Sequence, residues 1–307
     1  MDKSMTSSSI EGICPIIATP FTEAGEVDYD GLNDVVRWMA AGGCHAGTLF
    51  GIAGEYYKLS DDERFRMVDV TVTACREAGL TSIISVTDHA TEIAVQRARQ
   101  WEEAGADCIM LLPPFFLKPS AGELYQHMLA VGRSVSIPVM IQYAPEQTGV
   151  TMTPESLASI RGELSIPVIY KIENRPPGKT ISRLLEITEG EAKVFIGNAG
   201  FQLLEGLERG AIGAMPGCSM FDVYLKIYDA WKQGNRAEAL HTHTALLAVL
   251  NHIRQNVEQI IQFEKLILKR RGVIRSDYCR RPGYASDPVY DRLFEEVYAM
   301  VEPHLTA

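Results

Sequence analysis

Lys171 is the residue whose type and surroundings point most directly to chemistry. It lies in an apolar, strand-like run, residues 167–172, whereas the other lysines fall in polar loops, at segment ends or on helices with charged neighbours. A buried ammonium loses its hydration unless it is paired or neutral, and a neutral amine is a nucleophile. Lys171 therefore predicts an enzyme that forms a Schiff base with a carbonyl substrate. The alternative is a lysine that extends its amine along the strand to solvent.

Tyr143 ends the apolar run that precedes Lys171, residues 138–143. If the two runs are neighbouring parallel strands, the phenol and the amine reach the same pocket. The phenol could then relay protons while a carbinolamine forms and loses water. A half-buried tyrosine with its hydroxyl in water explains this residue equally well.

Two further polar side chains follow apolar runs. Glu173 lies two residues beyond Lys171, so it would face the same side of a strand and could pair with Lys171 or contact a substrate hydroxyl. A loop or capping carboxylate is an equal alternative. Asn198, in the Gly-Asn-Ala-Gly stretch 197–200, could bind substrate hydroxyls, although this stretch is also an ordinary turn with a helix cap.

A glycine-flanked loop is the third candidate feature. It follows the apolar run 46–50, precedes a Ser60–Glu63 capping box, and consists of Gly51, Ile52, Ala53, Gly54 and Glu55. Such a turn exposes backbone N–H groups and can bind a carboxylate without a cation. As a bare pattern it is weak, because such loops are common turns.

The elements that must position these residues alternate along the chain. Short apolar runs are separated by segments with apolar residues three to four positions apart, and the eight runs are residues 13–18, 46–50, 82–86, 107–112, 138–143, 167–172, 194–196 and 211–215. This pattern predicts a parallel α/β sheet closed into a (β/α)8 TIM barrel, with an open doubly wound sheet as the alternative. We expect a flexible N-terminus over 1–11, a catalytic barrel over 12–217 and a C-terminal helical domain over 218–307.

Composition excludes several classes of function. The net charge is -10 and no block of Lys and Arg dominates, so nucleic acid is not an expected partner. No apolar run reaches the length of a membrane span, and the start of the chain is polar, so neither a membrane nor secretion is expected. The six cysteines are scattered, which predicts reduced thiols in the cytoplasm. Histidines and acidic residues lack metal-ligand spacing, so no metal is expected. No other cofactor is expected either, because the iminium of a Schiff base supplies the electron sink.

Taken together, these motifs resemble the dihydrodipicolinate synthase/N-acetylneuraminate lyase family over nearly the whole chain. The motifs are 19–21, 51–55, 112–119, 142–145, 170–173 and 197–200. The resemblance implies a (β/α)8 barrel with C-terminal helices, a homotetramer built as a dimer of dimers, and a lysine that forms a Schiff base with a 2-oxo acid. It matches Lys171 to that lysine, Tyr143 to the proton-relaying tyrosine, and Ile52 and Ala53 to the backbone that holds the substrate carboxylate. It also matches Gly197 and Gly213 to glycines that line the pocket.

Four positions depart from true dihydrodipicolinate synthases. Those enzymes carry two threonines where Ile52 and Ala53 stand, a tyrosine from a neighbouring subunit where Phe116 stands, and an arginine near Gln147. The chain looks more like the branch of 2-keto-3-deoxy sugar acid aldolases and dehydratases, in which the dehydratases would have an acidic residue in place of Tyr143. We therefore predict a metal-independent class I lyase that cleaves or dehydrates a 2-keto-3-deoxy sugar acid. Synthase-type pyruvate condensation and a catalytically silent sugar-acid-binding or regulatory relative are the alternatives.

Overall fold

The computed structural model describes residues 10–306, which form two compact units. Within the described residues, the first contains 10–11 and Thr81–Met215, and the second contains Gly12–Leu80 and 216–306. The flexible N-terminus predicted over 1–11 lies almost entirely outside the described residues. The division into a barrel and a helical domain at residue 217 follows the types of element and stays a prediction.

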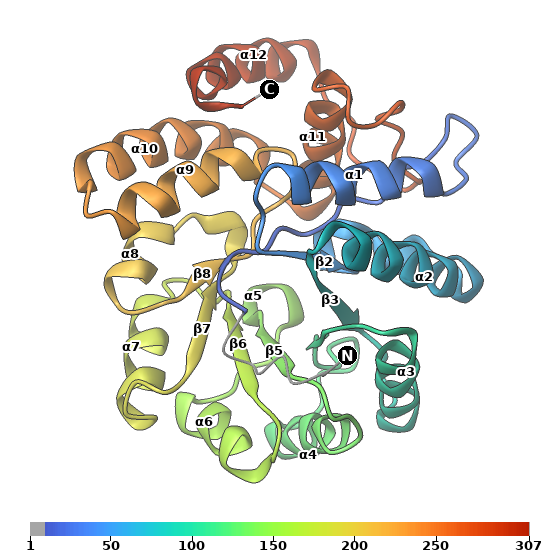
Figure 1. Ribbon diagram of the computed structural model, residues 1–307, viewed down its shortest axis with the longest axis vertical. Coiled ribbons are helices and arrows are strands. Elements are labelled where there is room, and N and C mark those ends of the chain that lie inside the picture. The colour runs from blue at the N-terminus through green and yellow to red at the C-terminus, as the bar shows by residue number, and fades with distance from the viewer. Residues whose placement is uncertain (1–9, 307) are drawn as a thin grey trace. The chain divides into compact units, whose positions relative to one another are not determined.

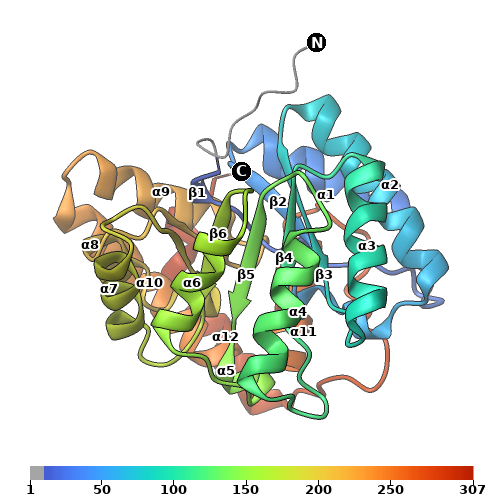
Figure 2. The same cartoon turned by 90° about the horizontal axis from the view of Figure 1, so that it is seen from below.

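The first unit is a run of parallel strands separated by helices. Its strands pair in sequence order and are β3 (Thr81–Val86), β4 (Cys108–Leu111), β5 (Val139–Tyr143), β6 (Val168–Ile172), β7 (Lys193–Ile196) and β8 (Gly213–Ala214). The helices between them are α3 (Thr91–Ala104), α4 (Ala121–Gly132), α5 (Pro145–Thr148), α6 (Pro154–Glu163), α7 (Gly178–Ile187) and α8 (Leu203–Glu208). Figures 1 and 2 show α3, α4 and α6 along the outer side of the strands.

Burial explains why these strands are continuous apolar runs. Every residue of β4 and β6 is buried, as expected for parallel strands with other layers on both faces. Lys171 interrupts this apolar character in β6, and Gln142 does so in β5. Register places these two residues directly opposite each other, and Phe195 of β7 lies opposite Lys171 on the other side.

The second unit combines both ends of the chain. It contains β1 (Gly12–Ile13), α1 (Tyr29–Ala41), β2 (Ala46–Leu49), the 3-10 turns η2 (Ile52–Gly54) and η3 (Tyr56–Lys58), α2 (Asp61–Ala78), α9 (Phe221–Lys232), α10 (Arg236–Ile253), α11 (Val257–Arg270), α12 (Pro288–Val301) and η5 (Glu302–His304). Helix α1 packs beside α2, and α10 packs beside both α9 and α12 (Figure 1).

The boundaries follow local chemistry. Ser60 caps α2 in the predicted capping box, since its hydroxyl accepts from Glu63 N while the Glu63 carboxylate accepts from Ser60 N. Each of the eight predicted apolar runs contains one strand or part of one. Strand β1 is shorter than the run 13–18, which contains Pro15, because proline has no N–H to donate to a ladder.

Candidate active site

Lys171 is buried on β6, and its ammonium is paired. Its side chain is 4% exposed, and its Nζ lies 2.9 Å from Oε1 of Glu173, whose side chain is 8% exposed. The amine therefore does not extend to solvent, which removes the alternative of a lysine reaching along the strand. A buried ammonium with a single carboxylate can return to the neutral amine by passing its proton to that carboxylate.

Glu173 is the residue on which the other polar groups of the first unit converge. Its Oε2 accepts a hydrogen bond from Gln142 Nε2 at 3.1 Å, and its Oε1 lies 3.5 Å from the backbone N of Asn198. Its backbone N donates to Tyr143 O and its backbone O accepts from Asn198 Nδ2, at 2.9 and 2.5 Å. The prediction that Glu173 pairs with Lys171 is confirmed, and this carboxylate is not a helix cap.

Gln142 supplies a polar atom with no partner inside this cluster. Its side chain is buried, and Oε1 accepts no hydrogen bond from any residue between 10 and 306. A buried amide oxygen without a donor is unfavourable, so a hydroxyl group of a bound molecule would be stabilised there. Sequence reasoning did not select Gln142, although an amide alone in an apolar strand was a usable signal.

Asn198 and Gly197 follow β7 in an uncommon backbone conformation. Asn198 and Ala199 both have positive φ angles, 52° and 51°, which bulky residues rarely adopt. The Asn198 amide does not cap a helix; it binds the Glu173 backbone, and its Oδ1 accepts a 3.5 Å hydrogen bond from Arg175 Nη2. A Cβ on Gly197 would lie 2.1 Å from Cγ of Glu173, so only glycine allows this approach.

Tyr143 ends β5 and Gly213 begins β8, and neither pairs with Lys171 in the register of the sheet. Tyr143 pairs in register with Ile172 rather than Lys171, and its hydroxyl accepts from Met152 N at 3.4 Å. Burial raises the pKa of the phenol and Glu146 adds to the rise, while the Met152 N–H opposes it. The phenol is therefore protonated at neutral pH. Gly213 on β8 pairs with Phe195 of β7, and Phe195 pairs with Lys171 of β6. Gly213 therefore lies two strands from Lys171 in the same row of the sheet.

Phe116 lies in the loop after β4 and is far from buried. It is 77% exposed, and the next residue, Leu117, is 85% exposed. The resemblance matches Phe116 to a tyrosine that reaches the substrate site of a neighbouring subunit, and a substrate-binding role for Phe116 remains a prediction.

The loop from Gly51 to Glu55 belongs to the second unit. Gly54 and Glu55 are buried, Ile52 and Ala53 are half-buried, and the backbone N–H groups of Ile52 and Ala53 donate to no acceptor within the described chain. Glu55 belongs to the loop predicted to hold the substrate carboxylate, and its own carboxylate is fully buried in an ion pair with Lys265 of α11.

Lys265 corrects the prediction that only Lys171 among the lysines is unusual. Its side chain is completely buried on α11. The sequence contained a signal, because Ile261, Lys265 and Leu268 fall on one helical face and the two apolar residues mark that face as the core side.

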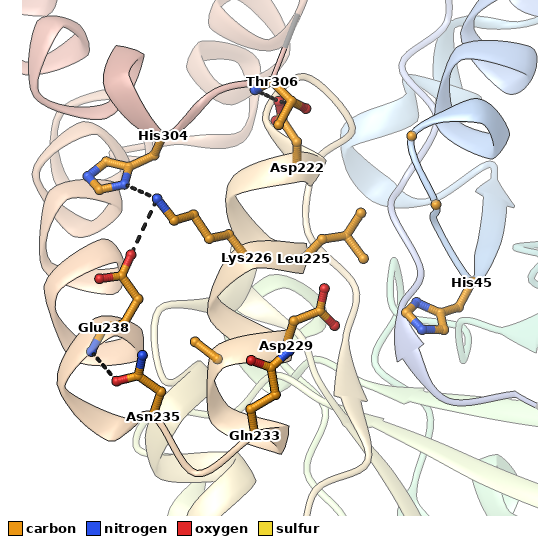
Figure 3. Close-up of a pocket in the computed structure, with 13 residues that line it drawn as sticks. His45, Asp222, Leu225, Lys226, Asp229, Gln233, Asn235, Glu238, His304 and Thr306 are labelled. Carbon is orange, nitrogen blue, oxygen red and sulfur yellow. Dashed lines mark hydrogen bonds and ion pairs between the residues drawn. The ribbon is translucent and has the colours of Figure 1, made fainter.

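Figure 3 shows a different pocket, which lies in the second unit. It is lined by charged residues of α9 and α10 and by the end of the chain, and Lys226 at its centre pairs with Glu238 and contacts His304. None of the predicted site residues lines it.

Neither a metal site nor a membrane-spanning helix is found among residues 10–306. No three histidine, cysteine, aspartate or glutamate side chains from 10 to 306 group as a metal site would require. None of the helices in that range combines the length and the apolar character of a membrane span.

Comparison with known proteins agrees with this geometry. The model of the dihydrodipicolinate synthetase family matches residues 9–297. An L-2-keto-3-deoxyarabonate dehydratase from Azospirillum brasilense is 29% identical over 91% of both chains. A 4-hydroxy-tetrahydrodipicolinate synthase from Archaeoglobus fulgidus is 31% identical over 77% of this chain and 80% of its own length.

A solved structure shows the fold. The crystal structure of a putative dihydrodipicolinate synthetase from Pseudomonas aeruginosa superposes with a TM-score of 0.89 at 27% identity, covering 96% of this chain and 100% of the other. The predicted (β/α)8 barrel with C-terminal helices is thereby confirmed, and the open doubly wound sheet is excluded. The chain belongs to the dihydrodipicolinate synthetase family and is a lyase of that family.

Proposed function

We propose that the protein is a Schiff-base lyase that dehydrates a 2-keto-3-deoxy sugar acid. The observation that carries this proposal is the 2.9 Å contact between Lys171 Nζ and Glu173 Oε1 inside a buried cluster. It puts a nucleophilic amine and a proton-transferring carboxylate on the same side of one strand. The similarity to an L-2-keto-3-deoxyarabonate dehydratase supports the same substrate class.

The reaction uses Lys171 as nucleophile. Glu173 takes the ammonium proton, and the free amine attacks the C2 carbonyl. Glu173 then returns its proton to the carbinolamine hydroxyl, which leaves as water and gives an iminium. The iminium makes the C3 hydrogen acidic. Glu173, deprotonated again, removes that proton to leave an enamine, and the C4 hydroxyl departs as water with the same proton. Hydrolysis of the imine then frees the product, so the net change is the loss of one water.

The neighbouring groups have defined roles in this scheme. Gln142 Oε1, which lacks a donor among residues 10–306, accepts a hydrogen bond from a substrate hydroxyl. Asn198 and Gly197 hold Glu173 in place, and Gly213 keeps space in the same row of the sheet. Tyr143, with its protonated phenol, relays a proton from the attacking nitrogen to the carbinolamine oxygen and ends the step protonated.

The loop Gly51–Glu55 keeps the role that the family resemblance gave it. We propose that the N–H groups of Ile52 and Ala53, which have no acceptor among the described residues, bind the substrate carboxylate. Phe116 contributes to an interface between subunits, because exposed apolar side chains of this size are unfavourable in water. A homotetramer is the assembly we propose. The cytoplasm is the proposed location, in keeping with six cysteines that are all free thiols.

Aldol cleavage is the second candidate function. It is favoured by Tyr143, which stands where the dehydratase branch is expected to have an acidic residue. In that reaction the C3–C4 bond breaks and pyruvate is released with an aldehyde. The contact of Glu173 rather than Tyr143 with Lys171 is the reason we place dehydration first.

A product assay separates these functions. The protein is incubated with a panel of 2-keto-3-deoxy sugar acids, and the products are identified by mass spectrometry. A product lighter than its substrate by one water supports dehydration, whereas pyruvate supports aldol cleavage. Neither product from any substrate, together with no borohydride-trapped adduct on Lys171, would identify a catalytically silent relative.

A further inference from the structure

A second buried lysine, Lys265, has no part in the reaction described above. It lies in the middle of α11, and its side chain is completely buried. Its ammonium pairs with Glu55, donates to Tyr278 O at 3.1 Å and lies 4.2 Å from the centre of the Phe21 ring. Burial lowers the pKa of Lys265 and the Glu55 carboxylate opposes that effect. A charge so fully removed from water is retained only where its partner is fixed.

Its partner, Glu55, is also completely buried and ends the loop Gly51–Glu55. The second oxygen of this carboxylate accepts from Lys58 Nζ at 3.2 Å. Lys58 in turn binds Glu258 of α11 at 2.5 Å, and Tyr57 donates to the other oxygen of Glu258. Two glutamates and two lysines thus tie the loop to α11 with no net charge.

The backbone of the loop depends on this arrangement. Glu55 has a φ angle of 59°, a left-handed conformation that a non-glycine residue adopts only when its surroundings hold it there. Gly54 is held as well, since its carbonyl accepts from Thr19 Oγ1 at 2.6 Å. The N–H groups of Ile52 and Ala53, just before these anchors, have no acceptor within residues 10–306.

We propose that Lys265 is a positioning residue: by holding Glu55 it fixes the loop in the shape that presents the Ile52 and Ala53 N–H groups to the substrate carboxylate. The pair also cancels the negative charge of Glu55, which would otherwise repel an incoming carboxylate. This inference rests on the proposed function of the loop, but it concerns a residue that touches neither substrate nor Lys171.

A matched ion pair in the same unit serves as the control for a purely structural role. Arg271, the residue after α11, lies 2.7 Å from Asp222, and their side chains are 10% and 3% exposed. Arg271 also donates to Ser219 O at 2.8 Å. This pair joins α11 to the start of α9 and makes no contact with the loop, so breaking it destabilises the unit without changing the loop.

The experiment compares Lys265→Met, Arg271→Met and the double variant Glu55→Gln/Lys265→Met in the full chain. One measurement is the pyruvate concentration at which borohydride labels half of Lys171. The second is hydrogen exchange of the peptide covering residues 51–59 in the absence of ligand. Thermal unfolding reports the stability of each variant.

Lys265→Met is expected to raise the half-labelling concentration about tenfold, equivalent to roughly 1.4 kcal/mol of binding, and to speed exchange in the loop. Arg271→Met is expected to lower the unfolding temperature without either change. The double variant has no unpaired buried charge, so its thermal stability is expected to recover. Hydrogen exchange in its loop is expected to stay fast, and its half-labelling concentration is expected to stay high.

Two results would overturn the proposal. One is hydrogen exchange of the loop peptide that proceeds at the wild-type rate in both Lys265→Met and the double variant. The other is an Arg271→Met variant that changes labelling as much as Lys265→Met does, which would reduce Lys265 to a general stabiliser. If the wild type is never labelled on Lys171, the proposed function fails, and loop exchange alone still decides whether Lys265 positions the loop.

Discussion

At the scale of single residues, the contact between Lys171 and Glu173 dominates the site. The two side chains come from the end of β6 and the position just after it, and both are more than nine-tenths buried. A carboxylate beside the amine can take its proton, hold it and return it to a leaving hydroxyl. The same side chain therefore serves both imine formation and water loss.

Glu173→Gln tests this dual use. Glutamine keeps the shape and can still accept from Gln142, but it cannot carry the transferred proton. We expect turnover to fall by about 10² to 10⁴, the usual contribution of a general acid or base. Borohydride should label Lys171 with pyruvate more slowly than in the wild type, because Glu173 also assists imine formation. Steady-state kinetics and labelling are measured on the same preparation.

Glu155→Gln is the matched control. Glu155 lies on α6, is 54% exposed and pairs with Arg183 at 2.8 Å, so its variant should retain turnover. Wild-type turnover in Glu173→Gln would show that Glu173 only fills space beside the lysine.

At the scale of elements, the sequence predicted the strands well and the contacts less well. All eight apolar runs contain a strand because continuous burial of parallel strands leaves a clear pattern. A helical region after residue 217 was also predicted, and α9, α10, α11 and α12 lie there. Gln142 and Lys265 were missed because the role of each depends on a side chain from another part of the chain. Gln142 donates to Glu173, and Lys265 pairs with Glu55. Side-chain direction also escaped prediction, since Tyr143 is level with Ile172 and not with Lys171.

The close approach of the β6 and β7 ends gives a prediction at this scale. In Gly197→Ala the new Cβ would lie 2.1 Å from Glu173 Cγ, so Glu173 must move away from Lys171. We expect turnover to fall at least tenfold and stability to fall by about 1–3 kcal/mol, as overpacking does. Kinetics and chemical unfolding measure the two effects.

Gly162→Ala is the control for replacing a glycine by alanine where the new Cβ meets no neighbour. Gly162 lies in α6, and nothing stands within 4 Å of the position its Cβ would take. Alanine there should stabilise the helix by about 0.5–1 kcal/mol and leave turnover unchanged. Equal kinetics in Gly197→Ala and wild type would mean that Glu173 tolerates displacement.

At the scale of the whole molecule, the family assignment and the exposed Phe116 and Leu117 together suggest assembly. A tetramer would bury these side chains, and each fully buried apolar side chain of this kind contributes about 1.5–3 kcal/mol. Phe116→Ser/Leu117→Ser should therefore shift the protein toward smaller species in analytical ultracentrifugation, with an unchanged circular dichroism spectrum. A wild-type protein that sediments as a single chain would contradict this prediction.

In the proposed reaction Lys171, and not the completely buried Lys265, forms the Schiff base. The most direct test is to incubate the protein with pyruvate and borohydride and to locate the reduced adduct by peptide mass spectrometry. We predict one adduct, on the peptide that contains Lys171, and none in Lys171→Met. An adduct on Lys265 instead, or no adduct with pyruvate or any other 2-oxo acid, would contradict the mechanism.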